Sequence, residues 1–190
     1  QFLPPSLGLA FISGDSKGGL TIYHNNGLIF EEFKIDSFHE FTSDLRVSTY
    51  PPQTHVACIS GNNIVVFEIV FNEKPELLLL RKYSSVFGYI SFGFGPKNTV
   101  WSVSKNSLIC KFDLSSNKPE SMLKEGNPIY ISPSPVSGNS CAVLYNDSKV
   151  VVFVGTVTNE FQHQVKNAAI IEWSPLGTSI IVYGDDTEEW

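Results

Sequence analysis

The sequence predicts an all-β protein made of repeated four-stranded units, and three observations lead to this prediction. Helical periodicity is nearly absent from the 190 residues. Short runs rich in Val, Ile, Phe and Tyr are bounded by Gly, Asn, Ser and Pro, as at residues 64–70, 99–103 and 150–154, which is typical of strands. About a dozen such strands fit, with turn signals every 8–12 residues or so. The strands also recur with a fixed period.

The repeat is marked by an aromatic residue near the middle of one recurring strand. These aromatic residues are Tyr23, Phe67, Phe112 and Phe153, spaced 44, 45 and 41 residues apart. A polar turn precedes each of these strands, where Asn, Asp and Gly are expected to supply the positive φ of tight turns. A Pro or Gly turn lies one strand earlier. The polar turns are residues 15–19, 61–63, 104–107 and 146–149, and the Pro or Gly turns are 51–52, 95–96, 133–135 and 175–177.

Four strands in a period of this length indicate a β-propeller blade, which buries its faces by stacking on its neighbours around a central channel. In chain order we expect blades at residues 1–38 (partial), 39–84, 85–126, 127–167 and 168–190 (partial). Residues 7–12 and 179–183 both match the second strand of a blade, so about four blades are expected. A closed propeller often has seven blades or about 300 residues at this period. More sequence or a partner strand is therefore expected to complete it.

Three segments resemble the WD40-repeat family. Residues 13–23 resemble its turn and following strand, with Tyr23 in place of Trp, and residues 111–114 resemble its Trp-Asp ending, with Phe112 for Trp. Residues 170–178 resemble its inner strand and Ser-Pro-x-Gly turn. Gly-His and Trp-Asp pairs are absent, so Asp15 and Asp147 lack the family's His partner and are expected to be turn residues. The resemblance implies a non-catalytic protein–protein interaction scaffold, the propeller portion of a multisubunit eukaryotic assembly.

Charge and cysteine usage narrow the partners and the compartment. There are 13 Lys and Arg against 19 Asp and Glu, a net charge of −6, with no cluster of cations. Nucleic acid is therefore not expected as a direct ligand. No apolar run approaches the roughly 20 residues that span a bilayer. The widely spaced Cys58, Cys110 and Cys141 lie among apolar neighbours. They predict buried free thiols and an intracellular location, cytoplasmic or nuclear.

The sequence contains no recognisable catalytic constellation. The four histidines, His24, His39, His55 and His163, have no metal-ligand spacing, and His55 is expected to be a polar strand-end residue. A Ser nucleophile elbow is absent, and the Gly-rich residues 14–19 lack the spacing of a phosphate loop. The acidic residues 185–189 are expected to form a solvated end. We therefore expect no catalytic residue, cofactor or metal, and no enzyme.

Two other functions remain open at this point. One is a propeller domain of an enzyme or ligand-binding protein whose active face lies in other blades. The other is a subunit of the translation or RNA machinery that contacts RNA through a minor basic strip. Fold alone does not separate these alternatives from a scaffold.

Loops between blades offer the candidate partner site. Phe38 and Phe41 lie in the polar loop 35–43, and Phe87 lies in the equivalent loop 84–88. Exposed aromatic residues are enriched at binding hot spots, so these three residues are predicted to bind a protein partner. The alternative is that they pack beneath their loops on the blade. Open blade edges are a second candidate, because unpaired backbone groups invite strand addition.

Overall fold

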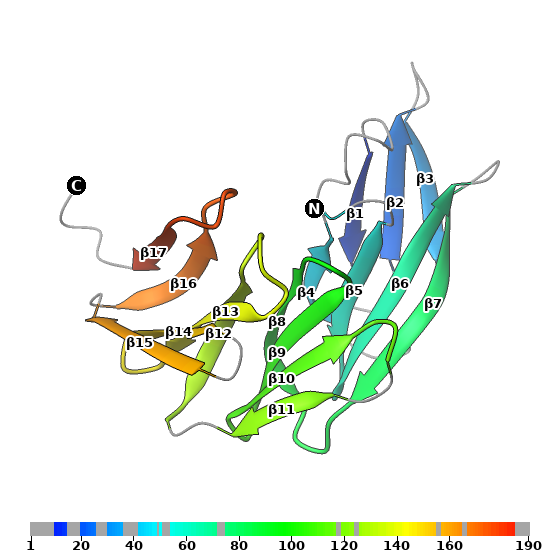
Figure 1. Ribbon diagram of the computed structural model, residues 1–190. Coiled ribbons are helices and arrows are strands. Elements are labelled where there is room, and N and C mark those ends of the chain that lie inside the picture. The colour runs from blue at the N-terminus through cyan, green and yellow to red at the C-terminus, as the bar shows by residue number, and fades with distance from the viewer. Residues whose placement is uncertain are drawn as a thin grey trace. The chain divides into compact units, whose positions relative to one another are not determined.

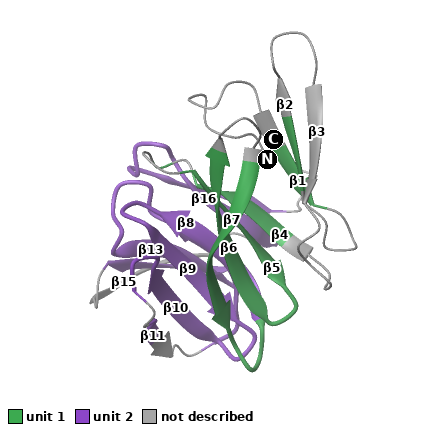
Figure 2. Cartoon of the chain, turned by 90° about the vertical axis from the view of Figure 1, so that its right-hand side faces the viewer, with its two compact units in different colours: residues 1–88 green, residues 89–190 purple. Residues whose placement is uncertain are grey.

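The computed structural model confirms an all-β protein. In the part of the chain that the structure describes, seventeen strands and no helix are present. More strands form than the dozen or so expected, because outer strands such as β11 and β15 are too polar to resemble half-buried strands. The structure describes residues 10–14, 20–25, 30–35, 42–48, 50, 54–71, 75–116, 119–123, 126–154, 157–164 and 167–184. The chain divides into two compact units, residues 1–88 and 89–190 (Figure 2).

The first unit contains two antiparallel sheets whose strands follow one another in sequence (Figure 1). The three-stranded sheet has the order β1-β2-β3 and the four-stranded sheet has the order β4-β5-β6-β7. The strand expected at residues 7–12 is observed as β1, and residues 7–9 lie outside the described part of the chain. The strands are β1 (Ala10–Gly14), β2 (Leu20–Asn25), β3 (Phe30–Ile35), β4 (Thr42–Val47), β5 (His55–Ser60), β6 (Asn63–Phe71) and β7 (Pro75–Ser84).

The second unit contains two four-stranded sheets and one two-stranded sheet, all antiparallel and again in sequence order. These are β8 to β11, β12 to β15, and the pair β16-β17. The strands are β8 (Tyr89–Gly95), β9 (Thr99–Ser104), β10 (Leu108–Asp113), β11 (Glu120–Leu123), β12 (Pro128–Pro133), β13 (Ser140–Tyr145), β14 (Lys149–Val154), β15 (Val157–Gln164), β16 (Ala168–Trp173) and β17 (Ile180–Gly184).

The four repeat aromatics occupy one and the same register. Each lies opposite the second residue of the preceding strand in its sheet, which confirms the repeat assignment. The pairs are Tyr23 with Phe11, Phe67 with Val56, Phe112 with Val100, and Phe153 with Cys141. The three phenylalanines are buried, whereas Tyr23 is half-buried.

The described hairpin turns at residues 61–62, 105–107 and 146–148 lie where the sequence predicts them, and the turn predicted at residues 15–19 lies outside the described residues. At two of these turns the residue with positive φ differs from the prediction. Gly61 has φ 56° in the two-residue β5–β6 turn, as expected. In the three-residue turns that precede β10 and β14, serines take this conformation: Ser107 at 65° and Ser148 at 64°. Both serine amides donate to the last residue of the previous strand, Ser104 and Tyr145, at 3.0 Å. A three-residue hairpin requires positive φ at its last position, whichever residue stands there.

The β12 to β15 sheet uses its two alternating faces to pack on both of its neighbours in the second unit. In β13, Cys141 and Val143 face a core shared with Trp101 and Val103 of β9. The intervening Ala142 belongs to a different core, shared with β16. In the first unit, Ile12 and Ile22 pack on the β4 to β7 sheet. Side chains on a strand alternate between faces, so one strand supplies two cores.

The three cysteines are free and buried, as predicted. Burial raises the pKa of the Cys58 thiol to about 12 and that of Cys110 to about 11, and it also raises the pKa of Cys141. The native protein should therefore alkylate slowly at neutral pH, because the reactive thiolate is scarce.

The raised cysteine pKa values also predict a pH dependence of stability. Unfolded thiols ionise first as the pH rises above about 8.5, so the stability present below that pH should fall between about pH 9 and 12.

Mass spectrometry after alkylation, with and without urea, tests the accessibility of the three thiols. Zero or near-zero labels are expected in the native state and three after unfolding. Three rapid labels in the native state would show that the thiols are accessible.

Candidate interaction surfaces

The loop between β7 and β8 is held against the β5–β6 turn of the same unit. The Ser85 amide donates to the Asn62 carbonyl at 3.1 Å, and the Gly88 amide donates to the Ser85 carbonyl at 3.2 Å. Gly88 has φ +76°, and a Cβ there would lie 2.6 Å from Asn62 Oδ1. Glycine is therefore required at this close approach. These contacts fix the backbone on both sides of the loop tip.

The loop tip presents two apolar side chains to solvent. Val86 is 88% exposed and Phe87 is 57% exposed. The Phe87 amide donates to Ser85 Oγ at 3.3 Å, which helps to hold the tip. The alternative that Phe87 packs beneath its loop is thus wrong. Phe38 and Phe41, the other two predicted partner residues, lie outside the described residues.

Sequence reasoning missed Val86, which is more exposed than its aromatic neighbour. Its exposure could have been inferred from its position between two serines and the Phe-Gly pair, because these neighbours offer few apolar atoms to cover a branched side chain. We call Val86 and Phe87 together the loop tip.

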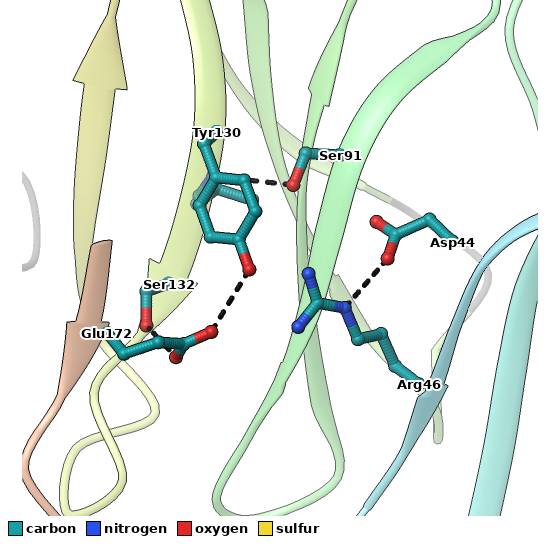
Figure 3. Close-up of polar contacts among 7 residues, drawn as sticks. Asp44, Arg46, Ser91, Tyr130, Ser132 and Glu172 are labelled. Atoms are coloured by element: carbon teal, nitrogen blue, oxygen red, sulfur yellow. Dashed lines mark hydrogen bonds and ion pairs between the residues drawn. The ribbon is translucent and has the colours of Figure 1, made fainter. Parts of the chain in front are cut away.

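A polar cluster connects β12 to β16 in the second unit (Figure 3). Tyr130 Oη and Ser132 Oγ each donate to one carboxylate oxygen of Glu172, both at 3.0 Å. The indole Nε1 of Trp173 donates to the Ser132 carbonyl at 2.9 Å. We call these four residues the Glu172 cluster. Both carboxylate oxygens accept hydrogen bonds from hydroxyl groups of β12. The Glu172 cluster therefore bridges two neighbouring sheets.

The first strands of the sheets carry two further polar contacts, one between two sheets and one within a strand. In the second unit, the amide of Ile131 donates to Ser91 Oγ at 3.4 Å and so joins β12 to β8. In the first unit, Arg46 Nε lies 2.8 Å from Asp44 Oδ1 within β4 (Figure 3).

Lys111 forms a second bridge between sheets of the second unit. Its Nζ lies 2.7 Å from Asn139 Oδ1, in the turn between β12 and β13, and 3.4 Å from Glu120 Oε2 of β11. It also lies 5.9 Å from the centroid of the Trp101 ring, within the range of a cation–π interaction. This lysine is therefore engaged within the fold.

Two titratable groups have shifted pKa values for structural reasons. His55 begins β5, as predicted for a strand-end residue, but it is buried. Burial lowers its pKa, and Glu68 on the adjacent strand partly opposes this shift. Asp113 accepts bonds from the Ser115 hydroxyl and amide, and these bonds lower its pKa. Burial in the fold thus accounts for the shift at His55, and the hydrogen bonds to Ser115 account for the shift at Asp113.

The other sequence candidates are accounted for in the same way. Asp147 Oδ1 accepts the Lys149 amide at 3.2 Å, which makes Asp147 a turn residue, as expected. Asp15 and the acidic residues 185–189 lie outside the described residues. Among the described residues, no group of three or more His, Cys, Asp or Glu side chains is placed to hold a metal ion. Nor do these residues form a helix long and apolar enough to cross a membrane.

Comparison with solved structures decides the fold. The β-propeller domain of Myceliophteria thermophila Cps50 (Swd1) superposes with a TM-score of 0.67 at 12% sequence identity. The chain has the fold of part of a β-propeller. The match covers 78% of this chain and 48% of the solved chain, so the propeller segment spans about half the length of that structure. No family model and no curated protein matches the sequence.

Proposed function

We propose that this propeller is a non-catalytic interaction scaffold, the WD40-like portion of a multisubunit eukaryotic assembly. Its blades comprise residues 39–84, 85–126 and 127–167, with partial blades at 1–38 and 168–190. The loop tip carries the proposal, because an exposed aromatic and an exposed branched side chain stand on a backbone anchored at both sides. Such preorganised apolar anchors favour protein binding, since little ordering entropy is lost on contact.

The partner is a protein, and the compartment is cytoplasmic or nuclear. The net charge of −6 disfavours a phosphate backbone as ligand. Three buried free thiols fit a reducing compartment. Phe38 and Phe41 remain proposed contacts in the equivalent loop of the preceding blade.

Replacing the loop tip tests this function. Val86→Ser with Phe87→Ser should reduce capture of the partner by about 30-fold, the effect of losing about 2 kcal/mol of hot-spot contact. The thermal midpoint should change by less than about 2 °C, because exposed side chains contribute little to the core. Capture from a lysate of the source cells, quantified by mass spectrometry, measures the first effect and a melting curve measures the second.

A matched control uses two apolar residues that are also more than half exposed, at other turns. Val136→Ser with Leu176→Ser removes comparable apolar surface from the second unit and should leave capture unchanged. Equal loss of capture in both double variants would indicate nonspecific apolar adsorption and would refute the loop-tip site. Phe38→Ser with Phe41→Ser forms a third arm, expected to weaken capture of the same protein. Capture of RNA in place of protein would favour the alternative of an RNA-machinery subunit.

A further inference from the structure

We infer that Ser84, the last residue of β7, is a phosphorylation site for a protein kinase that recognises basic residues, and that its phosphate releases the loop tip from its anchor. The inference rests on the proposed function in one respect, because the surface that it regulates is the loop tip. Ser84 is exposed and lies two residues before Val86. The phosphate donor is a nucleoside triphosphate.

The residues before Ser84 supply the charge pattern that such a kinase reads. Arg81 and Lys82 are the only two adjacent Lys or Arg residues in the chain, and they stand three and two positions before Ser84. A kinase cleft that carries carboxylates binds this pattern by charge complementarity. Lys82 is exposed, and side chains two positions apart lie on one side of a strand, so β7 presents Lys82 and Ser84 together.

The end of β7 can open toward a kinase cleft. Within the described residues β7 pairs with β6 alone, so it is the outer strand of its sheet. Arg81 Nη1 donates to the carbonyl of the adjacent Leu80 at 2.9 Å, and Arg81 Nε is buried without a hydrogen-bond partner among the described residues. An arginine held in this way gains hydrogen bonds when it moves to a carboxylate. Local opening of this strand end therefore costs little.

Ser84 helps to hold the loop on the β5–β6 turn. Its hydroxyl donates to Asn63 Oδ1 at 2.7 Å. The two residues that follow are tied to the same turn, since the Ser85 amide donates to the Asn62 carbonyl at 3.1 Å and Asn62 Nδ2 donates to the Val86 carbonyl at 3.5 Å. Ser84 is thus the first of three successive residues that anchor the loop tip.

Phosphorylation reverses the contact between Ser84 and Asn63. An Oγ–P bond forms, the bond from the γ-phosphorus to the diphosphate breaks, and the hydroxyl proton passes to the catalytic base of the kinase. The hydroxyl donor is replaced by phosphate oxygens that carry about −1.5 to −2 charges and accept hydrogen bonds. Asn63 Oδ1 then faces another acceptor, and turning its amide over would lose the 3.1 Å bond from Nδ2 to the Ser60 carbonyl. The phosphate therefore separates the end of β7 from the β5–β6 turn.

Phosphorylation of the purified protein tests the site without any partner. The probe is the catalytic subunit of cyclic-AMP-dependent protein kinase with ATP, and peptide mass spectrometry locates the phosphate. We expect one phosphate on Ser84, none in Ser84→Ala, and an unchanged rate in Ser85→Ala. Lys82→Ala should slow labelling by about 10-fold, whereas Lys105→Ala, at another exposed cation, should not. No phosphate on Ser84, or equal labelling of Ser85, would overturn the inference.

Hydrogen exchange of the free protein tests the release. After phosphorylation, the amides of residues 85–88 should exchange about 10-fold faster, and the β13 amides of residues 142–144 should keep their rates and report that the protein is folded. Unchanged exchange at residues 85–88 would contradict the release.

Capture of the partner separates this inference from the proposed function. The phosphorylated protein should capture at least about 10-fold less partner than the unmodified protein. Capture that the phosphate leaves unchanged, but that Val86→Ser with Phe87→Ser reduces, would contradict the regulation alone. Capture that neither change reduces would refute the proposed function, while the labelling of Ser84 and the exchange of residues 85–88 would still decide this inference.

Discussion

Phe153→Ala is expected to lower the free energy of unfolding by about 3–5 kcal/mol, the usual cost of removing a buried phenylalanine. Phe153 is buried in the core that joins the β8 to β11 sheet to the β12 to β15 sheet, in contact with a cluster that includes Trp101 and Cys141. The neighbouring strands are held in register and cannot collapse into the cavity. Urea denaturation followed by tryptophan fluorescence measures the change.

The adjacent Val154 is the matched control. It is on the same strand but exposed, so Val154→Ala should cost no more than about 0.5 kcal/mol. Phe67→Ala and Phe112→Ala should resemble Phe153→Ala, because both residues are buried at the same register. Similar losses for Phe153→Ala and Val154→Ala would refute the repeat core.

Glu172→Ala should destabilise the protein by about 2 kcal/mol, since it removes the charged acceptor of two hydrogen bonds. It leaves Tyr130 Oη and Ser132 Oγ without the carboxylate that joins β12 to β16. This value lies below the about 3–6 kcal/mol of two charged hydrogen bonds, because Glu172 is half-buried and water can replace part of the interaction. Thermal and urea unfolding measure the effect.

Glu120 provides the comparison for Glu172. Its carboxylate also contacts a neighbour, Lys111 at 3.4 Å, but its side chain is 79% exposed. Glu120→Ala should therefore change stability by less than about 0.5 kcal/mol. In a double-mutant cycle, Tyr130→Phe and Glu172→Gln should show a coupling of about 1 kcal/mol. Additive effects would mean that the Glu172 cluster does not join the two strands.

The repeat could be predicted from the sequence because the apolar core residues recur once in each repeat. Phe67, Phe112 and Phe153 are buried at the same register on the third strand of their four-stranded sheets, so they mark the phase directly. The sequence of the outer strand β15 is rich in polar residues, so it carries no clear periodic signal. The serines at positive φ were unpredictable from composition, because the hairpin length selects the position and not the residue.

Only part of the candidate sites could be found in this way. The exposure of Phe87 could be predicted because an aromatic in a polar loop has few places to be buried, and its role as a partner contact stays a prediction. The Glu172 cluster was missed, although Tyr130 and Glu172 lie 42 residues apart, about one repeat. That spacing places residues on adjacent sheets, but it does not show which side chains meet. Side-chain contact depends on the twist and separation of the sheets, which the period alone does not determine.

Hydrogen exchange with and without the captured partner tests most directly whether the loop tip binds a protein. We expect slower exchange in the partner complex at residues 84–88 and at the β5–β6 turn, residues 61–63, on which this loop is anchored. The turn at residues 174–179, which carries the control residue Leu176, should exchange at the same rate in both states. Protection confined to other segments, with residues 84–88 unchanged, would contradict the claim.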